Sequence, residues 1–252
     1  MKTYRAELHI HTVLSPCASV EMIPPLIVQE ALERGIHLLA ITDHNASANA
    51  GAVIEAAQGT ELIVLPGMEL QTREEVHLLC LFDTLEQLAE WQKTVDALLP
   101  KTANNSEFFG EQFVVDSSGD FIRREERLLL NSVDIELEHA TEQVTALGGL
   151  AIPAHIDRKA NGLIEILGII PPGFTALEIS RHISPEKALQ KFPQLNGYPL
   201  LQSGDVHQLD SFLGTTELTL NEPTIKEIRM ALNGQADHRV VIRQMDNLRP
   251  TI

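Results

Sequence analysis

Apolar residues along the chain fall into two alternating patterns. Short apolar runs are typical of buried strands, and longer segments with apolar residues at helical spacing are typical of amphipathic helices. We expect strands at residues 5–11, 37–42, 62–65, 76–82, 150–154, 176–179, 199–202 and 215–220. We expect helices at residues 24–35, 46–58, 85–99, 135–147, 185–192 and 224–232. The two kinds of element alternate along most of the chain.

This alternation predicts the class of fold. Strands that alternate with helices indicate a parallel sheet, and about seven such units indicate a closed barrel. We therefore expect a single α/β domain over residues 1–252. The alternation lapses at about residues 101–131, where residues 116–119 predict a hairpin turn and residues 123–127 are all charged. We predict an insertion there, either a lid or a solvated excursion.

The composition is that of a soluble globular protein, since 44% of the 252 residues are hydrophobic and 21% are charged. No apolar run reaches the roughly 20 residues that span a bilayer, and residues 1–7 lack the apolar stretch of a signal peptide. Cys17 and Cys80 are too few for a disulfide framework or a four-thiolate zinc site. We therefore expect a cytoplasmic protein with no membrane partner, in which histidines and carboxylates hold any metal.

The charge balance is acidic, with 19 basic residues against 35 acidic residues and a net charge of −16. A protein that grips duplex phosphates over a broad face carries the opposite sign. We therefore predict no broad duplex nucleic-acid binding. A short oligonucleotide or a small phosphorylated substrate remains open as a partner, because bound divalent ions recruit phosphate locally.

The placement of the ten histidines is the most informative feature of the sequence. Seven of them lie in or just after an expected strand, namely His9, His11, His44, His77, His155, His182 and His207. The C-terminal strand ends of a parallel barrel gather on one face, so we expect these histidines to converge there. His9 and His11 are two residues apart on a strand and project to the same side, where both imidazoles can reach one metal ion.

Two carboxylates follow apolar strands in the same way. Glu69 and Asp205 each lie where a strand has just ended, so each charge would be partly buried and would favour a cation. Structural roles remain open, since Glu69 could cap a loop, Asp205 could form an Asx turn and His77 could be a satisfied core histidine. Ligand-type residues at several strand ends together favour a metal site.

These residues occur in a definite order along the chain. They are His9-x-His11, Thr42-Asp43-His44, Pro66-Gly67-x-Glu69, His77, Ala154-His155 and Gly204-Asp205-x-His207. The ordered set resembles the motifs of the PHP (polymerase and histidinol phosphatase) superfamily, and is similar to its small stand-alone members. The resemblance covers about residues 7–220. It implies a distorted, TIM-like (β/α)7 barrel with a phosphoesterase site that holds two or three divalent metal ions.

The resemblance also implies which residues bind each of the first two ions. The ligands of the first ion would be His9, His11, Glu69 and Asp205. The ligands of the second ion would be Glu69, His77 and His155. Glu69 would therefore bridge the two ions.

The third ion would bind His44 and His207, together with an acidic residue or histidine that follows His-x-His shortly in many family members. Pro16 stands where that acidic residue often falls. Glu21 is the nearest carboxylate and Cys17 the nearest thiol, and Cys17 either ligates a metal or fills a small apolar space. The third site is thus the place where this sequence departs from the family pattern.

The ligand set predicts the chemistry. Clustered divalent ions lower the pKa of a bridging water, neutralise phosphate oxygens and steady the leaving oxygen. We expect a metal-dependent phosphoric ester hydrolase in which a metal-bound hydroxide attacks a phosphomonoester, with Glu69, Asp205 and His207 as catalytic residues. A nucleoside bisphosphate, a short oligonucleotide or a small phosphorylated metabolite would fit. Nitrogen and oxygen ligands admit Mn²⁺ (manganese), Fe²⁺ (iron) and Zn²⁺ (zinc).

Two arginines follow expected strands close to these ligands. Arg158 and Arg181 could bind a second phosphate or a terminal carboxylate of the substrate. Alternatively, they are rim residues paired with Asp157 or Glu186. If both arginines face the metal site, the substrate carries two anionic groups.

Two other functions remain open. A metal-dependent amidohydrolase shares the barrel class and the His-x-His pattern, but such enzymes generally have a lysine bridge where this chain has Glu69. A non-catalytic module that binds metal or nucleotide would hold the ions without turnover, and Pro16 near the third site favours it. The sequence does not indicate an oligomeric state.

Overall fold

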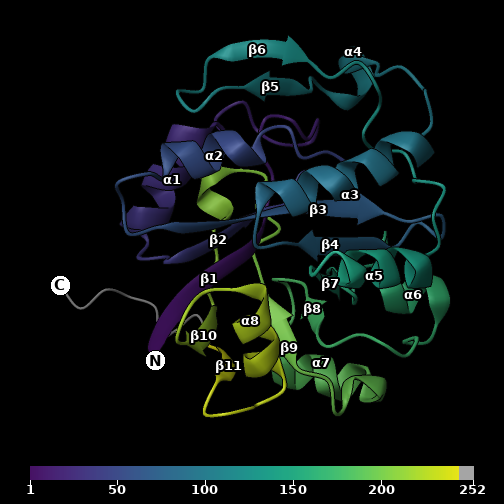
Figure 1. The fold of residues 1–252 in the computed structure, drawn as a ribbon. Coiled ribbons are helices and arrows are strands. Elements are labelled where there is room, and N and C mark those ends of the chain that lie inside the picture. Colours follow the sequence, from purple (N-terminus) through teal and green to yellow (C-terminus); the bar gives the residue numbers. More distant parts are fainter. Residues whose placement is uncertain (244–252) are drawn as a thin grey trace.

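The computed structural model describes residues 1–243 and contains one curved main sheet with helices around it (Figure 1). The main sheet has seven strands in the order β11-β10-β1-β2-β3-β4-β7. In chain order they are β1 (Lys2–Ile10), β2 (Leu38–Ile41), β3 (Ile63–Gln71), β4 (His77–Leu81), β7 (Leu150–Pro153), β10 (Thr216–Leu220) and β11 (Arg239–Ile242). Two short sheets accompany it, β5 (Phe113–Val115) with β6 (Phe121–Arg124), and β8 (Leu177–Ile179) with β9 (Leu200–Gln202).

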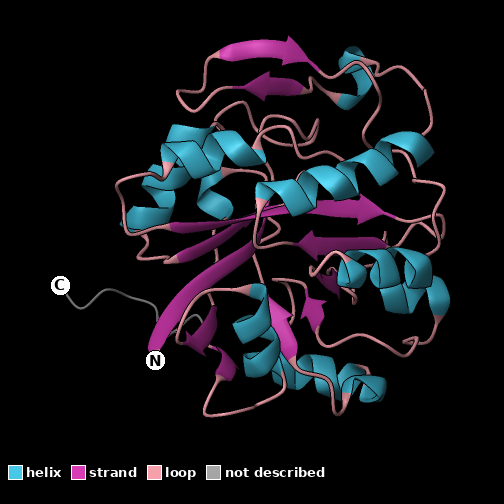
Figure 2. Cartoon of the chain, viewed as in Figure 1, coloured by secondary structure: helices cyan, strands magenta, loops and turns pink. Residues whose placement is uncertain are grey.

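Helices pack outside the strands (Figure 2). They are α1 (Pro24–Glu33), α2 (Ala50–Ala56), α3 (Leu85–Leu98), α4 (Ser106–Phe109), α5 (Leu137–Ala146), α6 (Leu163–Leu167), α7 (Pro185–Lys191) and α8 (Ile225–Leu232), with two 3₁₀ turns, η1 (Pro193–Leu195) and η2 (Leu209–Ser211). Local sequence explains their starts. Pro24 opens α1, and Thr84 with Gln87 forms a capping box at α3. Every segment predicted to be helical contains a helix, although α2 is shorter than the predicted 46–58.

The sheet mixes two strand directions. β1, β2 and β3 are parallel, whereas β4 is antiparallel to β3 and β7, and β10 is antiparallel to β1. The prediction of a distorted, TIM-like α/β barrel is confirmed, but the expectation of a wholly parallel sheet is wrong. Only residues 72–76 join β3 to β4, and a parallel crossover needs about a dozen residues or more. The reversed β4 puts its first residue, His77, opposite Gln71 at the end of β3.

Hydrogen bonds between the segments that follow the strands bring distant strands of the barrel together. Ile156 N donates to Glu178 O (2.9 Å) and so joins the segment after β7 to β8. Val206 N donates to His9 O (3.0 Å) and His11 N donates to Val206 O (2.9 Å), so the segment after β9 returns to the end of β1. The C-terminal ends of β1, β3, β7 and β9 therefore meet at one place.

Two apolar clusters hold the layers together. In β2, Leu38 and Ala40 belong to one cluster, and Leu39 and Ile41 belong to the other, as the alternation of side chains along a strand requires. Trp91 of α3 is fully buried in the second of these clusters. Each fully buried large aliphatic side chain stabilises the fold by about 1.5–3 kcal/mol. The strand ends that carry polar residues are thus fixed by a continuous apolar core beneath them.

Residues 101–131 form an ordered excursion that contains α4 and the β5-β6 hairpin and lies beyond α2 and α3 (Figure 1). The predicted hairpin is present, and Gly119 N donates to Asp116 O (3.0 Å) at its turn. The excursion packs on the loop after β1, because Phe113 N donates to Val13 O (2.9 Å). Its role as a lid or a solvated excursion stays a prediction.

Within residues 1–243, no helix combines the length and the apolar character needed to cross a membrane. The expected domain of residues 1–252 includes residues 244–252, which lie outside the described residues. The single-domain interpretation of the whole chain therefore stays a prediction.

Candidate metal centre

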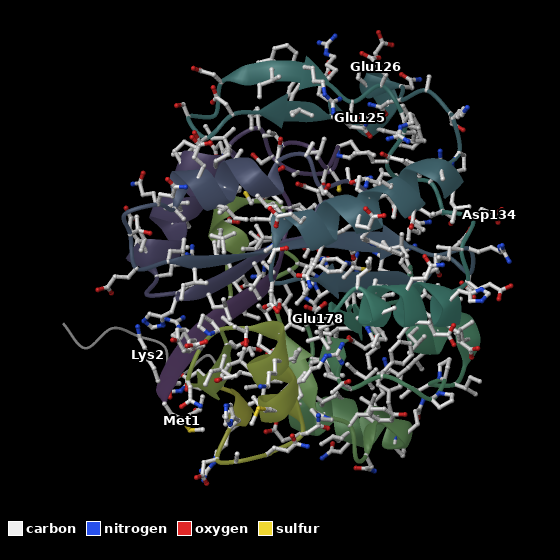
Figure 3. All side chains as sticks on the ribbon, in the orientation of Figure 1. Met1, Lys2, Glu125, Glu126, Asp134 and Glu178 are labelled. Atoms are coloured by element: carbon white, nitrogen blue, oxygen red, sulfur yellow. The ribbon has the colours of Figure 1, made fainter. Side chains whose placement is uncertain are left out.

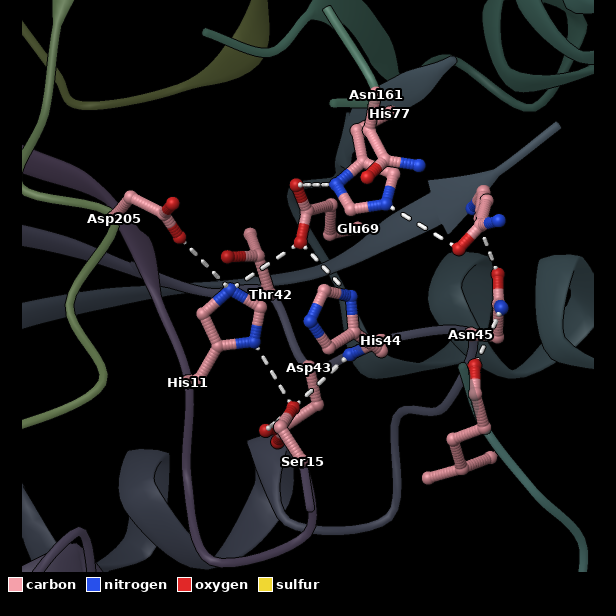
Figure 4. Close-up of polar contacts among 12 residues, drawn as sticks. His11, Ser15, Thr42, Asp43, His44, Asn45, Glu69, His77, Asn161 and Asp205 are labelled. Atoms are coloured by element: carbon pink, nitrogen blue, oxygen red, sulfur yellow. Dashed lines mark hydrogen bonds and ion pairs between the residues drawn. The ribbon is translucent and has the colours of Figure 1, made fainter. Parts of the chain in front are cut away.

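Eight side chains predicted as metal ligands come from the ends of several strands and converge on one cluster. Figure 4 shows His11, His44, Glu69, His77 and Asp205 of this cluster. His9 lies in β1 and His11 directly after it, Glu69 lies in β3, and His77 begins β4. His44 follows β2, His155 follows β7, and Asp205 and His207 follow β9. The antiparallel β4 explains how a histidine at the start of a strand joins residues at the ends of others. His182, which we expected to converge with them, is exposed and lines an adjacent pocket instead.

Glu69 is the centre of this cluster and is fully buried. Its Oε1 lies 2.7 Å from His77 Nδ1, 3.1 Å from His155 Nε2 and 3.2 Å from His9 Nε2. Its Oε2 lies 3.0 Å from His44 Nδ1 and 3.3 Å from His11 Nε2. One carboxylate is thus surrounded by five imidazoles from four segments of the chain, since His9 and His11 both belong to the end of β1. It is neither a loop cap nor an isolated buried charge.

Asp205 closes the other side of the cluster. Its Oδ1 lies 3.3 Å from His9 Nε2, 3.4 Å from His11 Nε2 and 3.3 Å from His207 Nδ1. Its Oδ2 is in close contact with Arg158 Nη1. His9 and His11 therefore each have one ring nitrogen between two carboxylates, a geometry in which a shared cation fits.

The electrostatics of the cluster follow from burial and charge pairing. Burial opposes ionisation of Glu69, but the surrounding imidazoles outweigh burial and hold the pKa of Glu69 well below its usual range. Burial opposes protonation of His9, but Glu69 and Glu178 raise its pKa well above the usual value. Burial lowers the pKa of His77 to about 4 and that of His207 to about 3. Ionised carboxylates and neutral imidazoles are the forms that bind metal cations.

Buried atoms without a partner test whether a metal fits. In the described part of the chain, seven cluster atoms are buried without a hydrogen-bond partner: His9 Nε2, His11 Nε2, His44 Nδ1, Glu69 Oε2, His77 Nδ1, His155 Nδ1 and Asp205 Oδ1. A buried polar atom without a partner costs about 1–3 kcal/mol. A divalent cation would satisfy several of these atoms at once. The nitrogen and carboxylate donors therefore fit metal ions.

The ligand atoms fall into three overlapping groups, each with its atoms within 4.8 Å of one another. The groups are His9, His11, Glu69 and Asp205; His44, Glu69 and His77; and His11, His44 and His207. The first group has the composition expected for the first ion. Glu69 is shared between the first two groups, as a bridging carboxylate requires.

One residue that we did not single out, Glu178, holds two of the ligands from behind. Glu178 is buried, and its Oε2 lies 2.9 Å from His9 Nδ1 and accepts the His155 N–H at 3.1 Å. Figure 3 labels Glu178 in the middle of the fold, while Asp134 lies at its periphery. The signal in the sequence was a lone acidic residue within the apolar run 176–179, which is unfavourable unless the charge has buried partners.

Asp43 and Ser15 support the loop that follows β1. Asp43 Oδ1 accepts hydrogen bonds from Thr12 N (2.7 Å) and Ser15 Oγ (2.7 Å). Ser15 Oγ also lies 2.9 Å from His11 Nδ1 and accepts the His44 N–H at 3.1 Å. Asp43 thus organises the loop after β1 rather than reaching the cluster, and its partner Ser15 orients His11.

The backbone adopts an unusual conformation at two of the ligands. His155 has φ = 30° and Asp205 has φ = 49°, in the left-handed region that residues with a Cβ rarely enter. Such strain costs of order 1–3 kcal/mol and persists where surrounding structure enforces it, commonly at functional sites. Glu178 contributes here, because it holds the His155 N–H.

A concave pocket of about 550 Å³ opens beside the cluster. Arg158 and Arg181 both line it, and their role in substrate binding stays a prediction. Arg181 Nη1 donates to Ser211 O at 2.8 Å, so this arginine is tied to the backbone of the pocket wall. Asp157 accepts the Ser180 N–H at 2.6 Å and the Ser180 hydroxyl at 2.7 Å, and Arg158 contacts Asp205. The alternative that these arginines are rim residues, paired with Asp157 or Glu186, stays open.

A second cavity, of about 390 Å³, lies over the cluster itself, and Cys17, His44 and His207 line it. Burial opposes protonation of His44, but Glu69 and then Cys17 raise its pKa to about 9. Glu21, the nearest carboxylate in sequence, is exposed and lines a separate surface pocket. Cys17, not Glu21, is therefore the residue of this loop that reaches the cavity.

A distorted α/β barrel with histidines and carboxylates gathered at its strand ends is the architecture of a metal-dependent hydrolase. The family model of the PHP domain matches residues 7–182, and the chain belongs to the PHP domain family. The predicted family is confirmed, and with it the prediction of a metal-dependent phosphoric ester hydrolase. No curated protein matches the chain by sequence.

Solved structures share the fold at low identity. Endonuclease Q from Pyrococcus furiosus, a lesion-specific endonuclease, has a TM-score of 0.70 at 20% identity, over 95% of this chain and 58% of that chain. A two-domain Bacteroides vulgatus protein containing a predicted PHP-like metal-dependent phosphoesterase has a TM-score of 0.53 at 14% identity, over 96% of this chain and 65% of that chain. The chain thus spans less than two thirds of the length of endonuclease Q.

The prediction that excluded broad duplex nucleic-acid binding is wrong. Endonuclease Q in complex with a 27-mer duplex substrate shares this fold with a TM-score of 0.62 at 19% identity, over 94% of this chain and 58% of that chain. Net charge sums the whole surface, whereas contact with a nucleic acid depends on charge near the site. Arg158 and Arg181 lie beside the cluster although the chain has a net charge of −16. Net charge was therefore an unsound ground for the exclusion.

Proposed function

We propose that this chain hydrolyses a phosphomonoester with the help of two or three divalent ions bound at the cluster. The observation that carries the proposal is the set of seven buried, unpartnered atoms of the ligand residues next to a pocket that contains two arginines. A pocket of about 550 Å³ matches the usual size of small-molecule sites. The substrate we propose is a small phosphorylated metabolite, a nucleoside bisphosphate or the end of an oligonucleotide.

The ligands divide naturally among the ions. His9, His11 and Asp205 would hold one ion, and Glu69 would bridge it to a second ion held by His77 and His155. His44 and His207 would contribute to a third. When bound, such ions acidify a water molecule and neutralise the charge on phosphate oxygens. Mn²⁺, Fe²⁺ and Zn²⁺ all accept this donor set.

The protein's own residues orient these ligands and the substrate. His155, Asp205, His207 and Arg158 line both cavities, so a phosphate bound over the cluster would extend into the larger pocket between them. The guanidinium of Arg158 and that of Arg181 can form charge-assisted hydrogen bonds to a second anionic group there. The side chain of His207 is 24% exposed, and it contacts both the cluster and the pocket, which supports a catalytic role beside Glu69 and Asp205.

Similarity to endonuclease Q favours a second candidate, cleavage of a phosphodiester within a nucleic acid. The endonuclease shares its fold with 95% of this chain. This chain spans only part of the endonuclease, so the activity of the whole enzyme does not transfer by fold alone. The two candidates differ in the bond that is cleaved, and substrates can separate them.

The test is a substrate panel with protein loaded with Mn²⁺, Fe²⁺ or Zn²⁺. The panel contains p-nitrophenyl phosphate, bis(p-nitrophenyl) phosphate, a nucleoside bisphosphate, and single-stranded and duplex oligonucleotides with labelled ends. We expect phosphate release from the monoesters, and none from a Glu69→Gln variant. Cleavage of the diesters alone would support the nuclease instead. Metal-loaded protein that cleaves no ester would refute both and favour an amidohydrolase or a binding module.

A further inference from the structure

We propose that Cys17 is a thiolate ligand of the third ion, together with His44 and His207. The inference rests on the proposed function, since it concerns one ion of that metal centre. Many family members have an acidic ligand where this chain has Pro16. In this chain the sulfur of the next residue, Cys17, would take the place of that ligand. The third site would then differ in chemistry from the two sites built on Glu69.

The three imidazoles of this site form a group without a carboxylate. His11, His44 and His207 place their ligand atoms within 4.8 Å of one another, and the His11 and His207 rings stack with centroids 4.0 Å apart. Each of the three also faces a carboxylate of the cluster: His11 Nε2 faces Glu69 and Asp205, His44 Nδ1 lies 3.0 Å from Glu69 Oε2, and His207 Nδ1 lies 3.3 Å from Asp205 Oδ1. Glu69 and Asp205 would already bind the first two ions, and neutral imidazoles supply no charge to a dication, so a third ion needs an anionic ligand of its own.

Cys17 is the residue in position to supply that charge. It lines the cavity over the cluster with His44 and His207. Its sulfur lies outside the three ligand groups of the described residues, so the side chain would turn into the cavity to bind the ion. His44 is only 6% exposed, and its Nδ1 has no hydrogen-bond partner. On binding, the Cys17 thiol would release its proton to solvent and form a metal–sulfur bond.

The loop around Cys17 is held firmly on both sides. Ser15 donates to Asp43 at 2.7 Å and lies 2.9 Å from His11 Nδ1. Gly110 packs so closely on the other side that a Cβ there would come 2.1 Å from the Pro16 carbonyl oxygen. Residues 15 and 16 are therefore fixed, and Cys17 follows them at the cavity wall. A preorganised ligand loses little freedom on binding a metal.

Sulfur would also change which metal the site prefers. Thiolate is a soft ligand that favours Zn²⁺, Co²⁺ and Cd²⁺, whereas carboxylate suits Mn²⁺. A site with Cys17 therefore prefers Zn²⁺ or Co²⁺ over Mn²⁺.

Cys80, the other cysteine, lies fully buried in the apolar core, and burial raises its pKa. It serves as an internal thiol that neither metal nor reagent reaches in the folded protein.

The test uses the full chain loaded with Co²⁺ and compares the wild type with Cys17→Ser and Cys17→Asp. Cys17 is exposed, so neither substitution threatens folding. We expect a thiolate-to-cobalt charge-transfer band in the wild type that both variants lack. Cys17→Ser should bind the last equivalent of Zn²⁺ at least about tenfold more weakly, and Cys17→Asp should recover binding and accept Mn²⁺ better.

Alkylation provides a second readout that does not depend on activity. Iodoacetamide should modify Cys17 in metal-free protein, and Zn²⁺ should slow that reaction at least about tenfold. Equal alkylation rates with and without Zn²⁺, in protein that binds metal at the other sites, would overturn the thiolate ligand alone. A cobalt band that survives in Cys17→Ser would do the same. Wild-type protein that binds no metal would contradict the proposed function as well.

Discussion

The Oε2 atom of Glu178 lies 2.9 Å from Nδ1 of His9, on the opposite side of the imidazole from Glu69 and Asp205. His9 Nε2 is thereby aimed at those two carboxylates, at 3.2 and 3.3 Å. The same Glu178 oxygen accepts the His155 N–H. One buried carboxylate thus orients ligands proposed for two different ions.

Replacing Glu178 by glutamine should weaken metal binding without removing any ligand. The amide oxygen can take the place of Glu178 Oε2 in both contacts, but the amide lacks the charge that favours the required tautomer of His9. We expect metal affinity to fall about 10- to 100-fold, measured by competition with a chelating dye. Glu61→Gln, at an exposed position, is the matched control and should leave affinity unchanged. An unaltered affinity in Glu178→Gln would contradict the orienting role.

Replacing Arg158 by alanine should raise KM for substrates with two anionic groups. Arg158 lines the pocket and contacts Asp205, so it lies between the cluster and the rest of the substrate. A lost charged hydrogen bond of about 1.5–3 kcal/mol corresponds to roughly 10- to 150-fold in KM. Steady-state kinetics with a bisphosphate and with p-nitrophenyl phosphate will show whether the loss is confined to the former. Lys159→Ala, at an exposed position, is the control, and equal effects of the two variants would refute a role for Arg158 in binding.

Gly110→Ala should destabilise the contact between the excursion of residues 101–131 and the loop after β1. An added Cβ would come 2.1 Å from the Pro16 carbonyl oxygen, and φ is +101°. Gly59 also has positive φ, at +81°, but has nothing within 4 Å of an added Cβ. Gly59→Ala is therefore the control, because it has the conformational cost of about 1 kcal/mol without a steric clash. We expect urea unfolding to show a loss for Gly110→Ala that is larger by about 1–3 kcal/mol. Equal losses would mean that the close contact at Pro16 does not matter.

His37 should make stability depend on pH outside the metal centre. Its Nδ1 accepts the Arg5 N–H at 3.1 Å, a bond that only an unprotonated Nδ1 can accept. Burial, then Lys2 and Arg5, lower the pKa of His37. The stabilisation is therefore present above the unfolded pKa of about 6.5, and is lost as pH falls through the lower folded value. We expect wild type to lose more stability than His37→Asn on acidification, measured by urea unfolding at equal metal loading. Parallel pH profiles would contradict this.

Removing the metal should lower the melting temperature, because the buried imidazoles and carboxylates then lose the cations that bind them. A ligand present at 100 times its dissociation constant stabilises the folded state by about 2.7 kcal/mol. Differential scanning calorimetry of dialysed protein with and without EDTA measures the effect, and restoring Zn²⁺ or Mn²⁺ should reverse it. A melting temperature indifferent to EDTA would show that the cluster does not hold ions.

Much of the site could be predicted from the sequence because each ligand follows or begins an apolar run. His9 and His11 could be predicted because they alternate with apolar residues on a strand. Glu69 and Asp205 could be predicted because each follows a short apolar run. His77 converges for a reason the pattern does not reveal, since the reversal of β4 depends on the short connection of residues 72–76. His182 shares the pattern but lies in the pocket, because its position after β8 carries it past the cluster.

Other features escaped prediction for physical reasons. Glu178 resembles any strand residue until its two partners, distant in sequence, are brought beside it. Arg158 and Arg181 were candidates from the sequence, but the sequence could not show which residues they pair with, because their partners depend on loop conformation. The net charge led to the wrong prediction that the chain does not bind duplex nucleic acid, because a net charge contains no information on where the charges lie.

The central claim is that Glu69 bridges metal ions in a phosphoesterase. The most direct test measures metal content by mass spectrometry, and phosphate release from a phosphomonoester, in wild type and in Glu69→Gln. Because five imidazoles surround this carboxylate, its charge cannot be replaced locally. We predict two or three equivalents of metal with turnover in the wild type, and loss of most metal with at least about a 100-fold slower rate in the variant. A variant that keeps both its metal and its rate would contradict the account.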